Sequence, residues 1–191
     1  MLSAADPLPF SPERVLIAGV TGSGKTTLAR RVAEVWDLHH VEIDGLFHGE
    51  NWTPRPSFID DVRAFAAEDR WVTEWQYTSK GTDAILAPRA QLVIWLDYPY
   101  PLVRRRLLLR TLKRRLLRTQ LWNGNVEPAL WTREGWTGEN DILRWQKDTR
   151  TKWIERMPDI EASHPHLQVV RLDHPRALET WLGRVESAPA S

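Results

Sequence analysis

The residues most able to do chemistry lie near the N-terminus, in the run Gly19-Val20-Thr21-Gly22-Ser23-Gly24-Lys25-Thr26. This run fits the pattern G-x-x-x-x-G-K-[ST] at every fixed position. Its glycines allow a tight turn with positive φ angles, and the turn directs successive backbone N–H groups toward one point. The N-terminus of a following helix would add its own unpaired N–H groups and its dipole. This arrangement is typical of a site for the phosphates of a nucleoside triphosphate.

Two side chains at the end of the run extend the prediction, because Lys25 can reach the β and γ phosphates and the Thr26 hydroxyl can bind Mg²⁺. The predicted ligands of the ATP phosphates are Gly19, Thr21, Gly22, Ser23, Gly24, Lys25, Thr26 and Thr27. The alternative is a chance glycine-rich turn. The apolar residues 15–18 before the run and the amphipathic residues 28–36 after it favour the phosphate site, since the motif requires a strand before it and a helix after it.

Three acids lie at the carboxyl ends of predicted strands, where ligands of an open parallel sheet bind: Asp44, Glu74 and Asp97. Glu74 lies in an apolar strand pattern, a costly place for a carboxylate, and we expect it to hold the Mg²⁺ shell together with Thr26. Asp44 is the expected general base toward an acceptor. Asp97 precedes Tyr-Pro, which is more typical of a helix cap. For all three acids, a cap or a surface ion pair is the alternative.

A basic segment follows, with eight Lys or Arg and no acid between Arg104 and Arg118. On a helix, the arginines spaced by four, Arg106, Arg110, Arg114 and Arg118, form one stripe, and Leu108, Leu109, Leu112 and Leu116 form another. A bound anion would relieve the repulsion between the arginines, and their forked guanidinium groups suit phosphate. We expect Arg110 and Arg114 to act in catalysis and Arg106 and Arg118 to bind nucleotide.

Two other interpretations of this helix remain open. It can be a solvated helix, or a nucleic-acid surface with Trp122, Trp131 and Trp136 stacking on bases. The tryptophans can equally form the small core of a lid, in which Asn123, Asn125 and Glu127 reach toward ligand. The six histidines show no metal-ligand spacing, so we expect them to be structural or exposed.

The elements that would position these residues alternate along the chain. Strands are predicted at residues 15–18, 41–43, 71–75, 91–96 and 167–172. Helices are predicted at residues 25–36, 57–67, 99–118, 139–157 and 175–186. This alternation predicts an α/β fold with a five-stranded, mainly parallel sheet between helices.

Length and composition set the outer limits. A chain of 191 residues suits one domain, here residues 13–187 with a helical lid at about 104–140, a flexible leader at 1–12 and a tail at 188–191. The absence of cysteine excludes disulfides and thiolate sites and fits a cytoplasmic protein. A net charge of +1 gives no general case for binding nucleic acid, and no apolar run is long enough to span a membrane.

With these residues in view, the chain resembles a family of P-loop proteins called adenylate-kinase-like or "DNA topology modulation" proteins. The resemblance covers about residues 14–175 and rests on the phosphate loop, Ile43-Asp44-Gly45, Trp52-x-Pro54, Trp71-Val72, Val93–Asp97 and the Arg-rich helix. The stretch Leu121–Pro128 resembles a subgroup called simply ATPases. The resemblance implies a nucleotide-kinase or shikimate-kinase type of fold with a closing lid.

The resemblance also bears on the acids. It implies that Asp44 meets the acceptor, and it matches Glu74 to a position where relatives usually have Asp followed by Gly-Asn. This chain has Glu74-Trp75-Gln76 at that position, so its acceptor site differs from that of the relatives. The Asp-Gly-Phe-Pro-Arg signature of adenylate kinases is also missing. AMP is therefore not the predicted acceptor.

Two functions follow from these observations. The first is an ATP- and Mg²⁺-dependent phosphotransferase, a kinase acting on a small-molecule or nucleotide acceptor, whose lid closes to exclude water. The second is a nucleotide-gated ATPase or regulatory protein that binds a nucleic acid or a protein partner.

Overall fold

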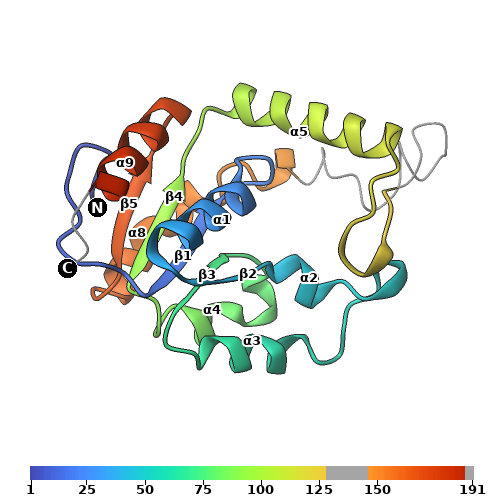
Figure 1. Ribbon diagram of the computed structural model, residues 1–191, viewed down its shortest axis with the longest axis horizontal. Coiled ribbons are helices and arrows are strands. Elements are labelled where there is room, and N and C mark those ends of the chain that lie inside the picture. The colour runs from blue at the N-terminus through green and yellow to red at the C-terminus, as the bar shows by residue number, and fades with distance from the viewer. Residues whose placement is uncertain (128–145, 188–191) are drawn as a thin grey trace.

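The computed structural model describes residues 1–127 and 146–187 and shows a five-stranded, fully parallel sheet (Figure 1). The strands are β1 (Arg14–Gly19), β2 (His39–Val41), β3 (Trp71–Glu74), β4 (Leu92–Leu96) and β5 (Gln168–Leu172). Their order in the sheet is β2-β3-β1-β4-β5, which places β1 at the centre. The predicted α/β class with a parallel sheet is confirmed.

Helices cover both faces of the sheet, as the burial of parallel strands requires. Helices α3 (Phe58–Ala66), α4 (Thr82–Leu86) and α8 (Lys152–Ser163) contribute to the core on one face. Helices α1 (Lys25–Trp36), α9 (Pro175–Ser187) and the start of α5 (Tyr100–Leu116) contribute to the core on the other. Residues of β1 alternate between the two cores, with Leu16 and Ala18 in the first and Val15 and Ile17 in the second.

This strand order decides where a ligand can bind. The carboxyl ends of β1, β3 and β2 lie side by side, so the loops that follow them meet at one edge of the sheet. Helix α5 extends beyond that edge, and the chain after it returns to lie against the segment between α2 (Ile43–Phe47) and α3 (Figure 1). The phosphate loop, the acids and the basic helix are thereby gathered at the same edge.

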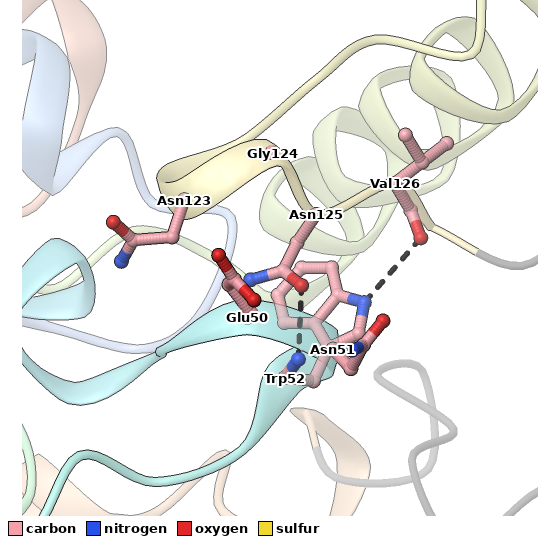
Figure 2. Close-up of a pocket in the computed structure, with 7 residues that line it drawn as sticks. All are labelled: Glu50, Asn51, Trp52, Asn123, Gly124, Asn125 and Val126. Carbon is pink, nitrogen blue, oxygen red and sulfur yellow. Dashed lines mark hydrogen bonds between the residues drawn. The ribbon is translucent and has the colours of Figure 1, made fainter.

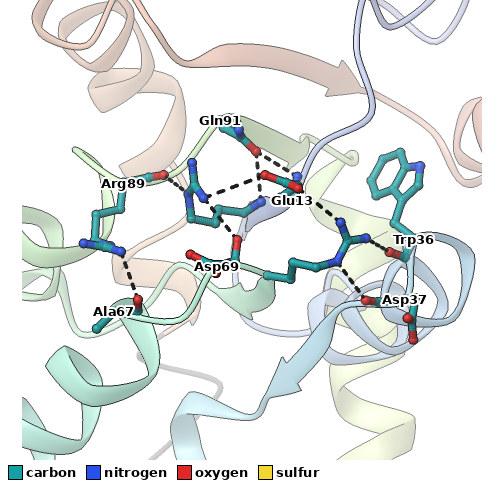
Figure 3. Close-up of polar contacts among 9 residues, drawn as sticks. Glu13, Trp36, Asp37, Ala67, Asp69, Arg89 and Gln91 are labelled. Carbon is teal, nitrogen blue, oxygen red and sulfur yellow. Dashed lines mark hydrogen bonds and ion pairs between the residues drawn. The ribbon is translucent and has the colours of Figure 1, made fainter. Parts of the chain in front are cut away.

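Arginine side chains connect neighbouring segments at the opposite edge of the sheet, where the strands begin (Figure 3). Arg70 donates to the carbonyls of Trp36 and Asp37 at the end of α1 and pairs with Glu13 at 3.2 Å. Arg89 donates to the carbonyl of Ala67 at the end of α3. Cations at helix C-termini satisfy carbonyls that lack a partner within the helix and oppose the dipole, so we assign this network to stability.

Several elements differ from the sequence prediction. The second strand ends at Val41, so Asp44 lies in the short helix α2 rather than after a strand. Helix α4 was not predicted, because its five residues carry too short a pattern to be recognised. Helix α8 runs to Ser163 through Pro158, beyond the predicted end at residue 157. Pro158 is the seventh residue of α8 and is exposed, so the helix continues past it with the proline ring on its solvent side.

The apolar stripe of α5 was also misassigned. Val103, Leu107 and Thr111 form its buried face. The four predicted stripe leucines, Leu108, Leu109, Leu112 and Leu116, are 43–61% exposed.

The first residues of the chain make specific contacts. Leu2 forms a parallel bridge with Val170 of β5, and the N-terminal ammonium pairs with Glu161 at 3.1 Å. Some of the sequence predictions lie outside the described residues: those for Trp131 and Trp136, for the first part of the helix expected at 139–157 and for the tail at 188–191. None of the helices in the described parts of the chain combines the length and the apolar content that a bilayer-spanning segment needs.

Candidate phosphoryl-transfer site

The phosphate loop has the backbone that its glycines predict. β1 ends at Gly19 and α1 begins at Lys25, so the strand, loop and helix follow one another without a gap. Gly24 has a φ of 102°, which a residue with a side chain rarely adopts, although a Cβ there would meet nothing within 4 Å. At Gly22 a Cβ would lie 3.0 Å from the Val103 carbonyl and the Leu107 Cβ of α5. The loop therefore packs directly on the basic helix.

Lys25, the first residue of α1, is buried against this loop, with 8% of its surface exposed. Its ammonium donates to the Val20 carbonyl at 3.3 Å. Burial lowers the pKa of Lys25 to about 8, although the carboxylates of Asp44 and Glu74 act in the opposite direction. An ammonium group desolvated in this way, at the N-terminus of a helix, gains most from a multiply charged anion.

Ser23 supplies a further donor to the loop. Its hydroxyl is buried and has no hydrogen-bond partner within the described residues. A buried hydroxyl is rarely left unpaired, so a phosphate oxygen is a suitable acceptor for it.

Glu74 is 1% exposed at the end of β3. One of its oxygens accepts from the Ile43 backbone N–H at 3.4 Å, and the other lies 3.7 Å from Nε2 of His40. Burial acts to raise the pKa of Glu74, but the His40 imidazole and the Thr26 hydroxyl outweigh it and the pKa is lowered. Glu74 is therefore an ionised carboxylate beside Thr26.

This pair suits Mg²⁺ in the way that nucleotide-dependent enzymes hold it. Oε1 of Glu74 has only the 3.7 Å ion pair with His40 and no hydrogen-bond partner within the described residues, so it can still accept from a metal-bound water. Among those residues no cluster of three His, Asp or Glu side chains could hold a metal alone. A magnesium ion here would therefore take most of its ligands from phosphate and water, as Mg²⁺ does in kinase sites.

Asp44 lies in α2 and is half-buried. Its Oδ1 accepts a 2.6 Å hydrogen bond from the Tyr77 hydroxyl, and His48 Nε2 lies 3.1 Å from the same hydroxyl. Burial, followed by the charge of Asp44, raises the pKa of Tyr77, so Tyr77 is the donor to the carboxylate. Burial also lowers the pKa of His48. These two partners could not be predicted from the sequence, because only the fold brings Tyr77 to Asp44.

The predicted arginine stripe is only partly retained. Arg106, Arg110 and Arg114 line the same cavity as the phosphate loop. Arg114 is paired with Glu127 at 3.3 Å, and burial, followed by Arg114, lowers the pKa of Arg110. Arg118 follows the end of α5, where a φ of 45° takes the chain out of the helix, so it no longer continues the stripe.

Residues 120–127, here named the post-α5 loop, attach to the segment after α2 (Figure 2). Asn125 accepts from the Trp52 backbone N–H at 2.9 Å and donates to the Gly49 carbonyl at 2.8 Å. Asn123 donates to the His48 carbonyl. Asn123 and Asn125, expected to reach a ligand, therefore bind the backbone of η1 (Glu50–Trp52) and its neighbours instead.

The phosphate loop, Asp44, His48, Tyr77 and the arginines of α5 border one cavity of about 1530 Å³, whereas Glu74, Asn123 and Asn125 are not among its lining residues. Pockets for a single small ligand are typically about 300–1,000 Å³, so this one has room for a nucleotide and a second molecule. Lys152, at the start of α8, also lines it and donates to the Thr78 hydroxyl at 2.9 Å. No motif in the sequence pointed to Lys152. Asp97, by contrast, pairs with Arg171 at 2.6 Å, as the ion-pair interpretation predicted.

The parallel sheet, its flanking helices and the phosphate loop define an α/β fold of the P-loop kinase type. The sequence matches no protein-family model and no curated protein. Two solved structures share the fold. A shikimate kinase from Acinetobacter baumannii, in complex with shikimate, is 15% identical over 91% of each chain, with a TM-score of 0.53. A gluconokinase from Sinorhizobium meliloti 1021 is 16% identical over 92% of each chain, with a TM-score of 0.51. At these identities the likeness shows the fold, and the resemblance to adenylate-kinase-like proteins stays a prediction.

Proposed function

We propose that this protein is a kinase that transfers the γ-phosphoryl group of ATP to a hydroxyl of a small molecule. The observation that carries the proposal is that Lys25 and Asp44 border one cavity, close enough for the carboxylate to act on the pKa of the lysine. A phosphate-binding loop and a candidate base are thus within electrostatic reach of each other. Two kinases of small hydroxylated acids with the same fold support this class of reaction.

Each step of the proposed reaction is assigned to particular residues of the site. Backbone N–H groups of Gly19–Thr26 and the Lys25 ammonium bind the β and γ phosphates. Oδ2 of Asp44, the oxygen that Tyr77 does not bind, accepts the proton of the acceptor hydroxyl. The acceptor oxygen then bonds to the γ phosphorus, the bond to the bridging β–γ oxygen breaks, and ADP leaves. Mg²⁺, held by Thr26 and through water by Glu74, would neutralise phosphate charge.

The arginines of α5 complete the site from the other side. Arg110 lies where Asp44, Arg114 and Glu127 all act on its charge, and Arg106 is placed one turn earlier on the same face. Arginine can bind two phosphate oxygens at once, and its charge is most valuable where negative charge develops. We assign Arg110 and Arg114 to the transferred phosphoryl group and Arg106 to the nucleotide.

The test is transfer from ATP labelled at the γ position to a panel of sugar acids, polyols, nucleosides and aromatic alcohols. Transfer to one class, lowered about a hundred-fold or more by Asp44→Asn while ATP affinity is unchanged, is the expected result. Asp97→Asn is the matched control, because Asp97 pairs with Arg171 instead. ATP consumed only as slow hydrolysis, whatever the acceptor, would contradict a kinase.

That contrary outcome would favour the second candidate, an ATPase acting on a partner. The observation in its favour is the row of exposed leucines on α5, beside the arginines. Binding of duplex or single-stranded DNA that weakens steeply with salt would indicate a nucleic-acid partner. ATP-dependent capture without such a salt response would indicate a protein.

A further inference from the structure

The acceptor end of the cavity is walled by aromatic rings. Two come from α2 and η1, one from the residue that follows α2, one from the loop after β3, and one from the post-α5 loop. They are Phe47, His48, Trp52, Tyr77 and Trp122. Asp44 and His48 are four residues apart and therefore lie on the same side of this segment of chain. The rings thus begin within one helical turn of the proposed base.

The polar atoms of Trp52, Trp122 and Tyr77 are already engaged by the protein, and Nδ1 of His48 is the one ring nitrogen of the wall without a hydrogen-bond partner in the described residues. Trp52 Nε1 donates to the Val126 carbonyl at 3.3 Å, and Trp122 Nε1 donates to Glu42 at 2.8 Å. The other oxygen of Glu42 accepts from Arg30 at 3.0 Å. The Tyr77 hydroxyl donates to Asp44. What the wall offers to a ligand is therefore ring carbon, with few free donors or acceptors.

The rings are also fixed in orientation before any ligand binds. His48 stacks on Trp122 with 22° between their planes and meets the edge of Trp52 at 82°. Trp122 packs on Gly45, where a Cβ would lie only 3.0 Å from the indole Cδ1. Gly45 follows Asp44 directly in the chain, so the Trp122 indole packs on the residue next to the proposed base. A preformed aromatic wall favours a flat ring, since little ordering is required on binding.

We propose that the acceptor is a molecule with a flat aromatic ring and a hydroxyl group, of the kind that a nucleoside represents. The ring lies against Trp52 and Trp122, and the hydroxyl reaches Asp44. This inference rests on the proposed kinase function and adds the chemical class of its acceptor. A polyol acid such as gluconate or shikimate fits the wall poorly, because its hydroxyls would lose water without gaining hydrogen bonds.

The test measures binding by calorimetry to the full chain with ADP and Mg²⁺ present, so that no reaction occurs. The probes are adenosine, uridine and 4-(hydroxymethyl)pyridine on one side, and gluconate and shikimate on the other. We expect at least one aromatic probe to bind about ten-fold or more tightly than either acid. Nucleosides and the simple aromatic alcohol are separate arms, which shows whether the ring alone is sufficient.

Two variants locate the binding. Trp122→Leu and Trp52→Leu keep an apolar side chain but remove the ring face, and each should weaken the aromatic probe about ten-fold while leaving ADP affinity within about two-fold. Trp36→Leu is the control, because Trp36 packs edge-on against Trp181, at the other end of α1 from the phosphate loop. Melting temperatures of all three confirm that they fold.

The outcomes separate this inference from the proposal beneath it. Tighter binding of gluconate or shikimate, no binding of any aromatic probe, or an aromatic affinity unchanged by both cavity variants would overturn the aromatic acceptor. Transfer of labelled phosphate to a polyol acid would support the kinase function and contradict the aromatic acceptor. Failure of ATP and ADP to bind at all would instead remove the kinase function itself.

Discussion

The hydroxyl of Tyr77 lies 2.6 Å from Oδ1 of Asp44. Tyr77 has a φ of 56°, a conformation that costs energy for a residue with a bulky side chain. It also stacks on Phe47 of α2, with ring centroids 4.2 Å apart. The strained backbone is thus fixed by contacts to the same helix that carries Asp44, and the hydrogen bond determines which carboxylate oxygen is left for an acceptor.

Tyr77→Phe should lower phosphoryl transfer while ATP affinity stays the same. Phenylalanine keeps the stacking and removes only the hydrogen bond, so Asp44 becomes free to rotate. We expect kcat to fall about ten-fold, the value of one hydrogen bond to a charged group, with KM for ATP unchanged. Tyr98→Phe is the control, because the Tyr98 hydroxyl is buried without a hydrogen-bond partner in the described residues. Equal kcat in wild type and Tyr77→Phe would remove Tyr77 from the mechanism.

ATP affinity should fall as pH rises through about 8. The pKa of Lys25 is lowered from 10.5 to about 8 by burial, and bound phosphate favours the protonated form. The free protein therefore loses the ammonium above this pH, and binding then requires proton uptake. We expect a loss of about ten-fold in affinity between pH 7.5 and 9, measured by titration of a fluorescent ATP analogue. Lys25→Met should bind weakly and without this pH dependence; a parallel pH profile in both proteins would refute the assignment.

Asn125→Ala should destabilise the protein. The Asn125 side chain is 4% exposed and forms three hydrogen bonds, to the Trp52 N–H and to the carbonyls of Gly49 and Trp122. Its removal leaves those backbone groups without partners, at a cost of about 2 to 3 kcal/mol. Urea denaturation should show this loss. Asn123→Gly is the comparison, because Asn123 is exposed and glycine tolerates its φ of 55°; a loss as large there would mean that burial of Asn125 is not the cause.

Local patterns made the backbone of residues 19–26 predictable. β1, the loop and α1 are consecutive, so the glycine spacing and the flanking apolar runs already contain the geometry. β3, β4, β5, α3 and α9 were recognised for the same reason. The position of Glu74 at the carboxyl end of β3 followed from strand order in parallel sheets, and its burial beside Thr26 agrees with that placement.

What the sequence did not reveal depends on contacts between distant segments. Tyr77 and Asp44 are 33 residues apart in the sequence. Lys152 reaches the cavity from α8, which packs on the face of the sheet opposite α1 and α5. Arg118 was placed on the stripe by its spacing alone, whereas the helix ends at Leu116. The leucines of α5 show the same limit, because their spacing predicted one apolar stripe, whereas the helix buries Val103 and Leu107 against the loop at Gly22 instead.

The most direct test of the whole account is nucleotide binding to Lys25→Ala. A fluorescent ATP analogue is titrated into the wild-type protein and the variant at pH 7.5, with Mg²⁺ present. The account predicts binding to the wild type and a loss of at least about ten-fold in the variant, because the buried ammonium is the central charge of the phosphate site. Equal affinity in the two proteins, or no binding to either, would contradict it.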